Sequence, residues 1–117
     1  MNKRYFPVVF SRTEVGNETV REWLKELTVQ ERKIIGEDIK TVQFGWPLGM
    51  PLIKKIEPGL WEVRSRLVNK ISRVIFTMMG GHIILLHGFI KKSQKLPDED
   101  LRIARQRLND IKGEMIK

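Results

Sequence analysis

The residues best suited to chemistry in this sequence are arginines and lysines carried by predicted strands. Arg64 and Arg66 are two positions apart, so in a strand their side chains leave the same face. Arg73 opens the next predicted strand across a short turn, which brings it within reach of that face. Guanidinium groups bind phosphate oxygens in bidentate fashion and stabilise negative charge that grows in a transition state. The pattern therefore predicts a basic concavity able to hold a phosphodiester.

The charge distribution also favours a polyanionic partner, although it leaves a second interpretation open. The chain of 117 residues has a formal net charge of +8 and an isoelectric point near 10.1. Residues 60–97 hold one acid, Glu62, against seven basic residues: Arg64, Arg66, Lys70, Arg73, Lys91, Lys92 and Lys95. A basic segment in an otherwise nearly balanced chain indicates a nucleic-acid-binding face. The alternative is an ordinary solvated sheet face on which Glu62 is a surface ion-pair partner.

Other common catalytic patterns are missing from the sequence. It has no cysteine, Gly-rich phosphate loop, paired-carboxylate motif or zinc-spaced histidine cluster, so no metal or other cofactor is expected. His82 and His87 are five residues apart on one predicted strand, so they should face opposite sides and could share a metal only across a bulge. For His87, a catalytic role and that of a satisfied core or rim histidine both stay open. The tryptophans are expected in the core rather than as base-stacking platforms: Trp23, Trp46 and Trp61.

The order of helical and extended segments predicts an α+β fold. Residues Tyr5–Phe10 are rich in aromatic and β-branched types and predict a first strand. Apolar residues at i, i+3, i+4 and i+7 predict a helix over Thr19–Leu27. Thr28, three residues before Glu31, forms a capping box that opens a second helix ending near Gln43. Because their connection is short, the two helices are predicted to form an αα-hairpin.

Three more strands and a last helix follow a segment that Gly and Pro interrupt. The strands are predicted at Leu60–Val68, Arg73–Met79 and His82–Ile90. Acidic residues after Pro97 and an apolar stripe ending at Ile111 predict the final helix. The order is therefore β-α-α-β-β-β-α, a small antiparallel sheet preceded by the αα-hairpin and followed by a C-terminal helix. We expect one domain over residues 1–117.

The sequence favours a soluble, cytoplasmic protein. Its most apolar run, Ile83–Leu86, is far shorter than a membrane span, and the apolar run after the basic N-terminus is too short for a signal peptide. The absence of cysteine fits a reducing compartment without proving one.

Three stretches of the sequence carry a resemblance to a known family. They are Leu-Trp-Glu-Val-Arg at residues 60–64, Arg-Val-Ile-Phe at 73–76, and Ile-Leu-Leu-His-Gly-Phe-Ile-Lys-Lys-Ser-Gln-Lys-Leu-Pro at 84–97. In this order and spacing they resemble the HigB-like, phage-derived toxins of the RelE/ParE superfamily of type II toxin–antitoxin systems. The similarity runs from about Leu48 to Ile111, and its most specific part is Leu-His-Gly-Phe-x-Lys-Lys followed by Lys-x-Pro. The family's small antiparallel sheet flanked by helices agrees with the predicted order.

The resemblance implies an endoribonuclease that cuts mRNA, usually on the ribosome, and is neutralised by a HigA-like helix-turn-helix antitoxin. In such toxins the RNA's own 2′-hydroxyl attacks the adjacent phosphorus and leaves a 2′,3′-cyclic phosphate, with no metal or other cofactor. Operator DNA would be contacted only through the antitoxin. Together with the charge pattern, the resemblance makes the expected catalytic residues Arg64, Arg73, Lys91 and Lys92, and the expected RNA contacts Arg66, Lys95 and His87.

One departure from the superfamily and two competing functions stay open. Some members stack a tyrosine on the scissile base, but the single tyrosine here, Tyr5, lies in the first predicted strand. Phe89 or His87 would have to substitute for it. The superfamily's other branch inhibits DNA gyrase and cleaves nothing, and a third alternative is a nucleic-acid-binding protein without activity. The basic cluster favours RNA, because a gyrase inhibitor needs no group of phosphate-sized cations.

Overall fold

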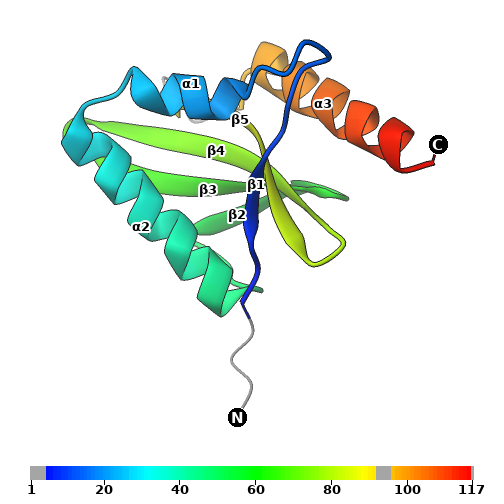
Figure 1. The fold of residues 1–117 in the computed structure, drawn as a ribbon. Coiled ribbons are helices and arrows are strands. Elements are labelled where there is room, and N and C mark those ends of the chain that lie inside the picture. The colour runs from blue at the N-terminus through cyan, green and yellow to red at the C-terminus, as the bar shows by residue number, and fades with distance from the viewer. Residues whose placement is uncertain (1–4, 92–95, 117) are drawn as a thin grey trace.

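The fold is a five-stranded, mostly antiparallel sheet with three helices, which confirms the α+β class predicted from the sequence. The computed structural model describes residues 5–91 and 96–116. Its elements are β1 (Val8–Phe10), α1 (Thr19–Lys25), α2 (Val29–Gly45), β2 (Ile53–Glu57), β3 (Leu60–Leu67), β4 (Lys70–Met79), β5 (His82–Lys91) and α3 (Asp98–Ile116). The strand order across the sheet is β1-β5-β4-β3-β2, with β1 parallel to β5 and the other neighbours antiparallel (Figure 1).

The sheet contains one strand more than the sequence predicted. The additional strand, β2, pairs with β3 at one edge of the sheet, and its five residues lie between Pro51 and Pro58. Adjacent lysines, Lys54 and Lys55, obscure the alternation of polar and apolar residues that identifies a half-buried strand. Short, lysine-bearing strands are typical of sheet edges, where they discourage pairing with another chain.

The helical pair before the sheet has the predicted start signal but a different arrangement. The Thr28 hydroxyl accepts a hydrogen bond from the backbone of Glu31, and the Glu31 carboxylate accepts one from the backbone of Thr28, so the capping box is confirmed. Figure 1 shows that α1 and α2 diverge from their connection instead of lying antiparallel, because each packs against the sheet. Within residues 5–91 and 96–116, none of the helices is long and apolar enough to cross a membrane.

Each face of the sheet has its own core, and this division decides where the charged side chains go. On one face α1 and α2 cover the larger core, against which the three tryptophans pack, as predicted: Trp23, Trp46 and Trp61. On the opposite face, called here the α3 face, Ala104 and Leu108 of α3 pack on apolar residues of β3, β4 and β5: Leu60, Ile75 and Leu86. Because α3 covers only one end of this face, the remainder is available to polar groups.

Gly88 lets α1 approach β5 closely, and this contact gives a prediction about stability. A Cβ atom at Gly88 would clash with the six-membered ring of Trp23. We expect Gly88→Ala to lower the free energy of unfolding by about 1–3 kcal/mol, since overpacking forces the ring or the backbone to shift. Gly113→Ala is the matched control: its Cβ would meet open space on α3, and alanine favours a helix by about 0.5–1 kcal/mol. Urea unfolding of both variants measures the difference in their stabilities. Equal unfolding midpoints would show that the Trp23 ring moves aside at little energetic cost.

Candidate functional site

The register of β3, β4 and β5 gathers the predicted site residues on the α3 face. Arg64 lies directly opposite Arg73, which in turn lies opposite Phe89. Directly opposed residues point to the same side of a sheet. One step toward the end of the sheet, the next row on this face contains Arg66, Ile71 and Lys91. We call Arg64, Arg66, Arg73 and Lys91 the basic cluster.

A bulge in β5 is required to bring the third strand into this cluster. Ile75 pairs with His87 and Phe76 pairs with Leu85, so Leu86 is an extra residue in β5. A bulge of this kind reverses the alternation of side chains beyond it. As a result His87, Phe89 and Lys91 point to the α3 face, whereas regular alternation from Leu85 would have sent them to the other one.

The bulge also overturns the prediction that the two histidines face opposite sides. His82 pairs with Met79 and His87 with Ile75, and these two partners are four residues apart on β4, so both histidines lie on the α3 face. They remain at different positions along the strand. Among the described residues there is no group of three or more His, Cys, Asp or Glu side chains that could hold a metal ion.

Arg73 is buried, so it does not lie on the ordinary solvated sheet face that the sequence left open as an alternative. Only 1% of Arg73 is accessible, and its guanidinium Nε lies 3.4 Å from Oε2 of Glu62, which is equally buried. The two side chains line a hollow of about 180 Å³ together with β2 residues and Leu96. The Glu62 carboxylate is therefore not the surface ion-pair partner considered from the sequence. It lies on the same sheet face as the basic cluster, in the row next to Arg64 and Arg73.

Arg64 and Arg66 are the more accessible members of the cluster. Arg64 is half-buried and Arg66 is exposed. Both line a second hollow of about 270 Å³, whose other lining residues are Asp38 of α2, Pro51, Leu52 and Ile71. Lys91 is half-buried as well. Its pKa lies below the ordinary value of a lysine because of burial first and the nearby charges of Arg64 and Arg73 second. The two arginines therefore lie close enough to Lys91 to repel its charge, and groups perturbed in this way are candidates for a binding site.

Two of the predicted site residues, Lys92 and Lys95, lie outside the described residues. Both belong to the segment between Lys91 at the end of β5 and Leu96 before α3. Lys91 itself is described, as are Arg64, Arg66 and Arg73.

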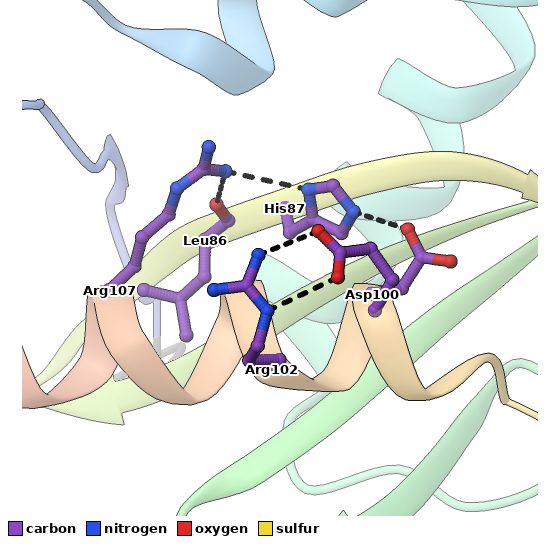
Figure 2. Close-up of polar contacts among 6 residues, drawn as sticks. Leu86, His87, Asp100, Arg102 and Arg107 are labelled. Carbon is purple, nitrogen blue, oxygen red and sulfur yellow. Dashed lines mark hydrogen bonds and ion pairs between the residues drawn. The ribbon is translucent and has the colours of Figure 1, made fainter.

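His87 lies beside the cluster but is engaged by α3. Its Nε2 is 2.6 Å from Oδ1 of Asp100, and its Nδ1 is 3.4 Å from a terminal nitrogen of Arg107 (Figure 2). That same Arg107 nitrogen donates a 2.6 Å hydrogen bond to the carbonyl oxygen of Leu86 at the bulge. The side chain of His87 is 15% exposed. His87 is therefore a satisfied rim histidine in the described structure, one of the two interpretations left open by the sequence.

Two residues of this region were missed as site candidates from the sequence. Glu62 alternates in phase with Arg64 and Arg66, and this spacing was a usable signal that it shares their face. Asp100 gave no such signal, because three consecutive acids at the start of a helix are explained by the helix dipole alone. Its contact with His87 depends on how α3 folds back across the sheet.

Fold and site together define a small α+β protein with a cluster of basic side chains beside α3 on one face of the sheet. The chain belongs to the family described as phage derived protein Gp49-like (DUF891), whose model matches residues 22–109. This family is part of the RelE/HigB-type toxin superfamily. The matched residues include the whole basic cluster, Glu62 and His87. No curated protein matches the chain.

Proposed function

We propose that this chain is the toxin of a type II toxin–antitoxin system and that it cleaves mRNA on the ribosome without a metal ion. The observation that carries the proposal is the convergence of Arg64, Arg73 and Lys91 around the buried carboxylate of Glu62 on one sheet face. Family membership supports a toxin, and the chemistry of the cluster supports a phosphodiester as its target.

The reaction that suits these groups is transesterification within the RNA. The 2′-hydroxyl loses its proton and its oxygen bonds to the adjacent phosphorus, while the bond from phosphorus to the 5′-oxygen breaks. Arg64 and Arg73 stabilise the charge that builds on the non-bridging oxygens. Lys91 donates the proton that the departing 5′-oxygen needs, and its lowered pKa makes it a better acid than an ordinary lysine. The products are a 2′,3′-cyclic phosphate and a 5′-hydroxyl.

Glu62 has a supporting role in this scheme. We infer that its 3.4 Å contact with Arg73 orients the guanidinium, and both side chains line the hollow. A buried arginine held in one orientation loses less freedom on binding phosphate than a mobile surface arginine does. Lys92 and Lys95 would add phosphate contacts from the segment after β5, and Arg66 would do so from the rim of the second hollow.

The proposal includes two partners besides RNA and the ribosome. A HigA-like helix-turn-helix antitoxin would neutralise the toxin, and operator DNA would be reached only through that antitoxin. Such an antitoxin would need to shield the basic cluster or hold the toxin away from the ribosome. The cytoplasm is the compartment in which all of these partners meet.

The chemical ends of the cut RNA test this proposal. We expect purified protein added to programmed ribosomes to produce fragments with 2′,3′-cyclic phosphate and 5′-hydroxyl ends. Cleavage should persist when 1,10-phenanthroline removes transition metals and magnesium is kept for the ribosome. A nuclease that used a transition metal would lose activity with the chelator, and a magnesium-dependent nuclease would be recognised by 3′-hydroxyl and 5′-phosphate ends.

Growth arrest in cells distinguishes the competing function. Expression of the chain without an antitoxin should stop incorporation of labelled amino acids before it stops DNA synthesis. Arrest of DNA synthesis first, with intact mRNA, would favour gyrase inhibition and reject the nuclease. Binding of RNA with neither cleavage nor arrest would leave a nucleic-acid-binding protein without activity.

A further inference from the structure

Two residues of α3 engage both ring nitrogens of His87 and thereby select one tautomer. Arg107 can only donate, so its 3.4 Å contact requires Nδ1 as the acceptor. The carboxylate of Asp100 accepts, so its 2.6 Å contact takes the hydrogen on Nε2. Both contacts are hydrogen bonds when the ring is the Nε2–H tautomer, and both ring nitrogens are then engaged by α3 and not by RNA.

The face of the fixed His87 ring lies against Phe89. The two ring centroids are 5.6 Å apart and the ring planes differ by 22°, which is a stacked arrangement. Both side chains point to the α3 face because of the bulge at Leu86. With its nitrogens engaged and its face against Phe89, His87 supports a neighbouring ring.

Phe89 is the aromatic residue nearest to the basic cluster in the register of the sheet. It lies directly opposite Arg73, and Lys91 follows two residues later on the same face. Phe89 is half-buried and packs at the margin of the apolar cluster under α3, so the residue keeps some accessible surface on the face that carries the basic cluster. An aromatic ring beside cations is the combination that binds single-stranded nucleic acid, with the base on the ring and the phosphate on the cations.

We propose that Asp100 and Arg107 are positioning residues that act through His87 to hold Phe89 as the surface on which an unpaired RNA base stacks. The inference rests on the proposed function, because it assigns the base contact of the same site. It removes His87 from the residues that touch RNA and adds Phe89. It also makes α3, which contributes no cation to the basic cluster, a determinant of how well the base is held.

The test measures base stacking directly and uses matched variants of α3. The probe is mRNA in programmed ribosomes, with 2-aminopurine in the codon next to be decoded and 2′-O-methyl groups that block cleavage. Stacking of the 2-aminopurine base on Phe89 should quench the fluorescence of 2-aminopurine. Asp100→Leu and Phe89→Leu should each weaken binding between about 5-fold and about 150-fold and reduce the quenching. Glu99→Leu is the control, because it removes the neighbouring acid, which pairs with exposed Arg102.

Two further variants separate positioning from general stability. Asp100→Asn should retain binding, since its amide oxygen still accepts from Nε2–H. His87→Phe should also retain binding, because a phenyl ring supports Phe89 without needing hydrogen bonds. In the His87→Phe background, Asp100→Leu should have no further effect on binding, and this loss of coupling would not follow from a purely structural role. The ¹⁵N spectrum of His87 should show the Nε2–H tautomer in the wild-type protein and a mixture in Asp100→Leu.

The outcomes separate this inference from the proposed function. Wild-type protein that cleaves unmodified mRNA but fails to quench the probe would overturn the inference and leave the nuclease standing. Equal effects of Asp100→Leu and Glu99→Leu, or loss of binding in His87→Phe, would overturn it as well. Wild-type protein that neither cleaves mRNA nor binds the probe would reject the proposed function, and the inference with it.

Discussion

Replacing Arg64 by glutamine should lower the rate of mRNA cleavage by about 10²- to 10³-fold while leaving the protein at least as stable as before. The loss of rate follows from removing one of the two guanidinium groups proposed to stabilise the charge on the phosphate oxygens. The gain in stability follows from the register, because Arg64 lies directly opposite Arg73. Like charges at directly opposed positions destabilise a sheet. Removing the charge of Arg64 should therefore raise the free energy of unfolding by about 0.2–1 kcal/mol.

This opposite change in activity and stability distinguishes a functional arginine from an ordinary surface one. Single-turnover cleavage and urea unfolding of the same preparation give both quantities. Lys33→Gln is the matched control, since it removes an exposed cation from α2, on the opposite side of the sheet, and should change neither quantity. Arg64→Lys should recover cleavage only in part, because an ammonium group cannot bind phosphate in bidentate fashion. Full activity in Arg64→Gln would exclude Arg64 from the site.

The local features of this fold could be predicted from the sequence because they depend on neighbouring residues. The capping box at Thr28 and Glu31 and the last three strands of the sheet are local in this sense. The edge strand β2 could not be predicted, because its pairing with β3 organises a segment without clear alternation. The parallel pairing of β1 with β5 joins residues more than 70 positions apart, and no local pattern encodes it.

The candidate site shows the same division between local and long-range information. The alternation in β3 correctly places Arg64 and Arg66 on one face. In β5 both faces carry apolar residues, so the sequence has no polar–apolar alternation that would reveal the bulge at Leu86. A prediction that assumes regular alternation along β5 places Lys91 on the face opposite to the one where the structure has it. The burial of Arg73 likewise depends on the neighbouring strands and on Leu96, which are distant in the sequence.

The buried pair of Glu62 and Arg73 gives the largest expected effect on stability. Each residue is about 1% exposed, so removing either leaves a charge in a poorly solvated place. Breaking a buried ion pair in this way typically costs about 3–5 kcal/mol, which is a large share of the stability of a small domain. We therefore expect Arg73→Met and Glu62→Leu to be strongly destabilised as single variants. Loss of toxicity in Arg73→Met alone would not identify a catalytic residue.

The double variant Glu62→Leu/Arg73→Met separates stability from function. Replacing both charges by apolar groups of similar size is often neutral or stabilising by about 1–4 kcal/mol, so the double variant should unfold near or above the wild-type midpoint. It should nevertheless cleave mRNA at least about 10²-fold more slowly, because the guanidinium opposite Arg64 is gone. A folded and inactive double variant would show that the Glu62–Arg73 pair serves phosphate binding and is not needed for stability. A folded double variant with wild-type cleavage would show that Arg64 and Lys91 suffice, and Arg73 would then be structural.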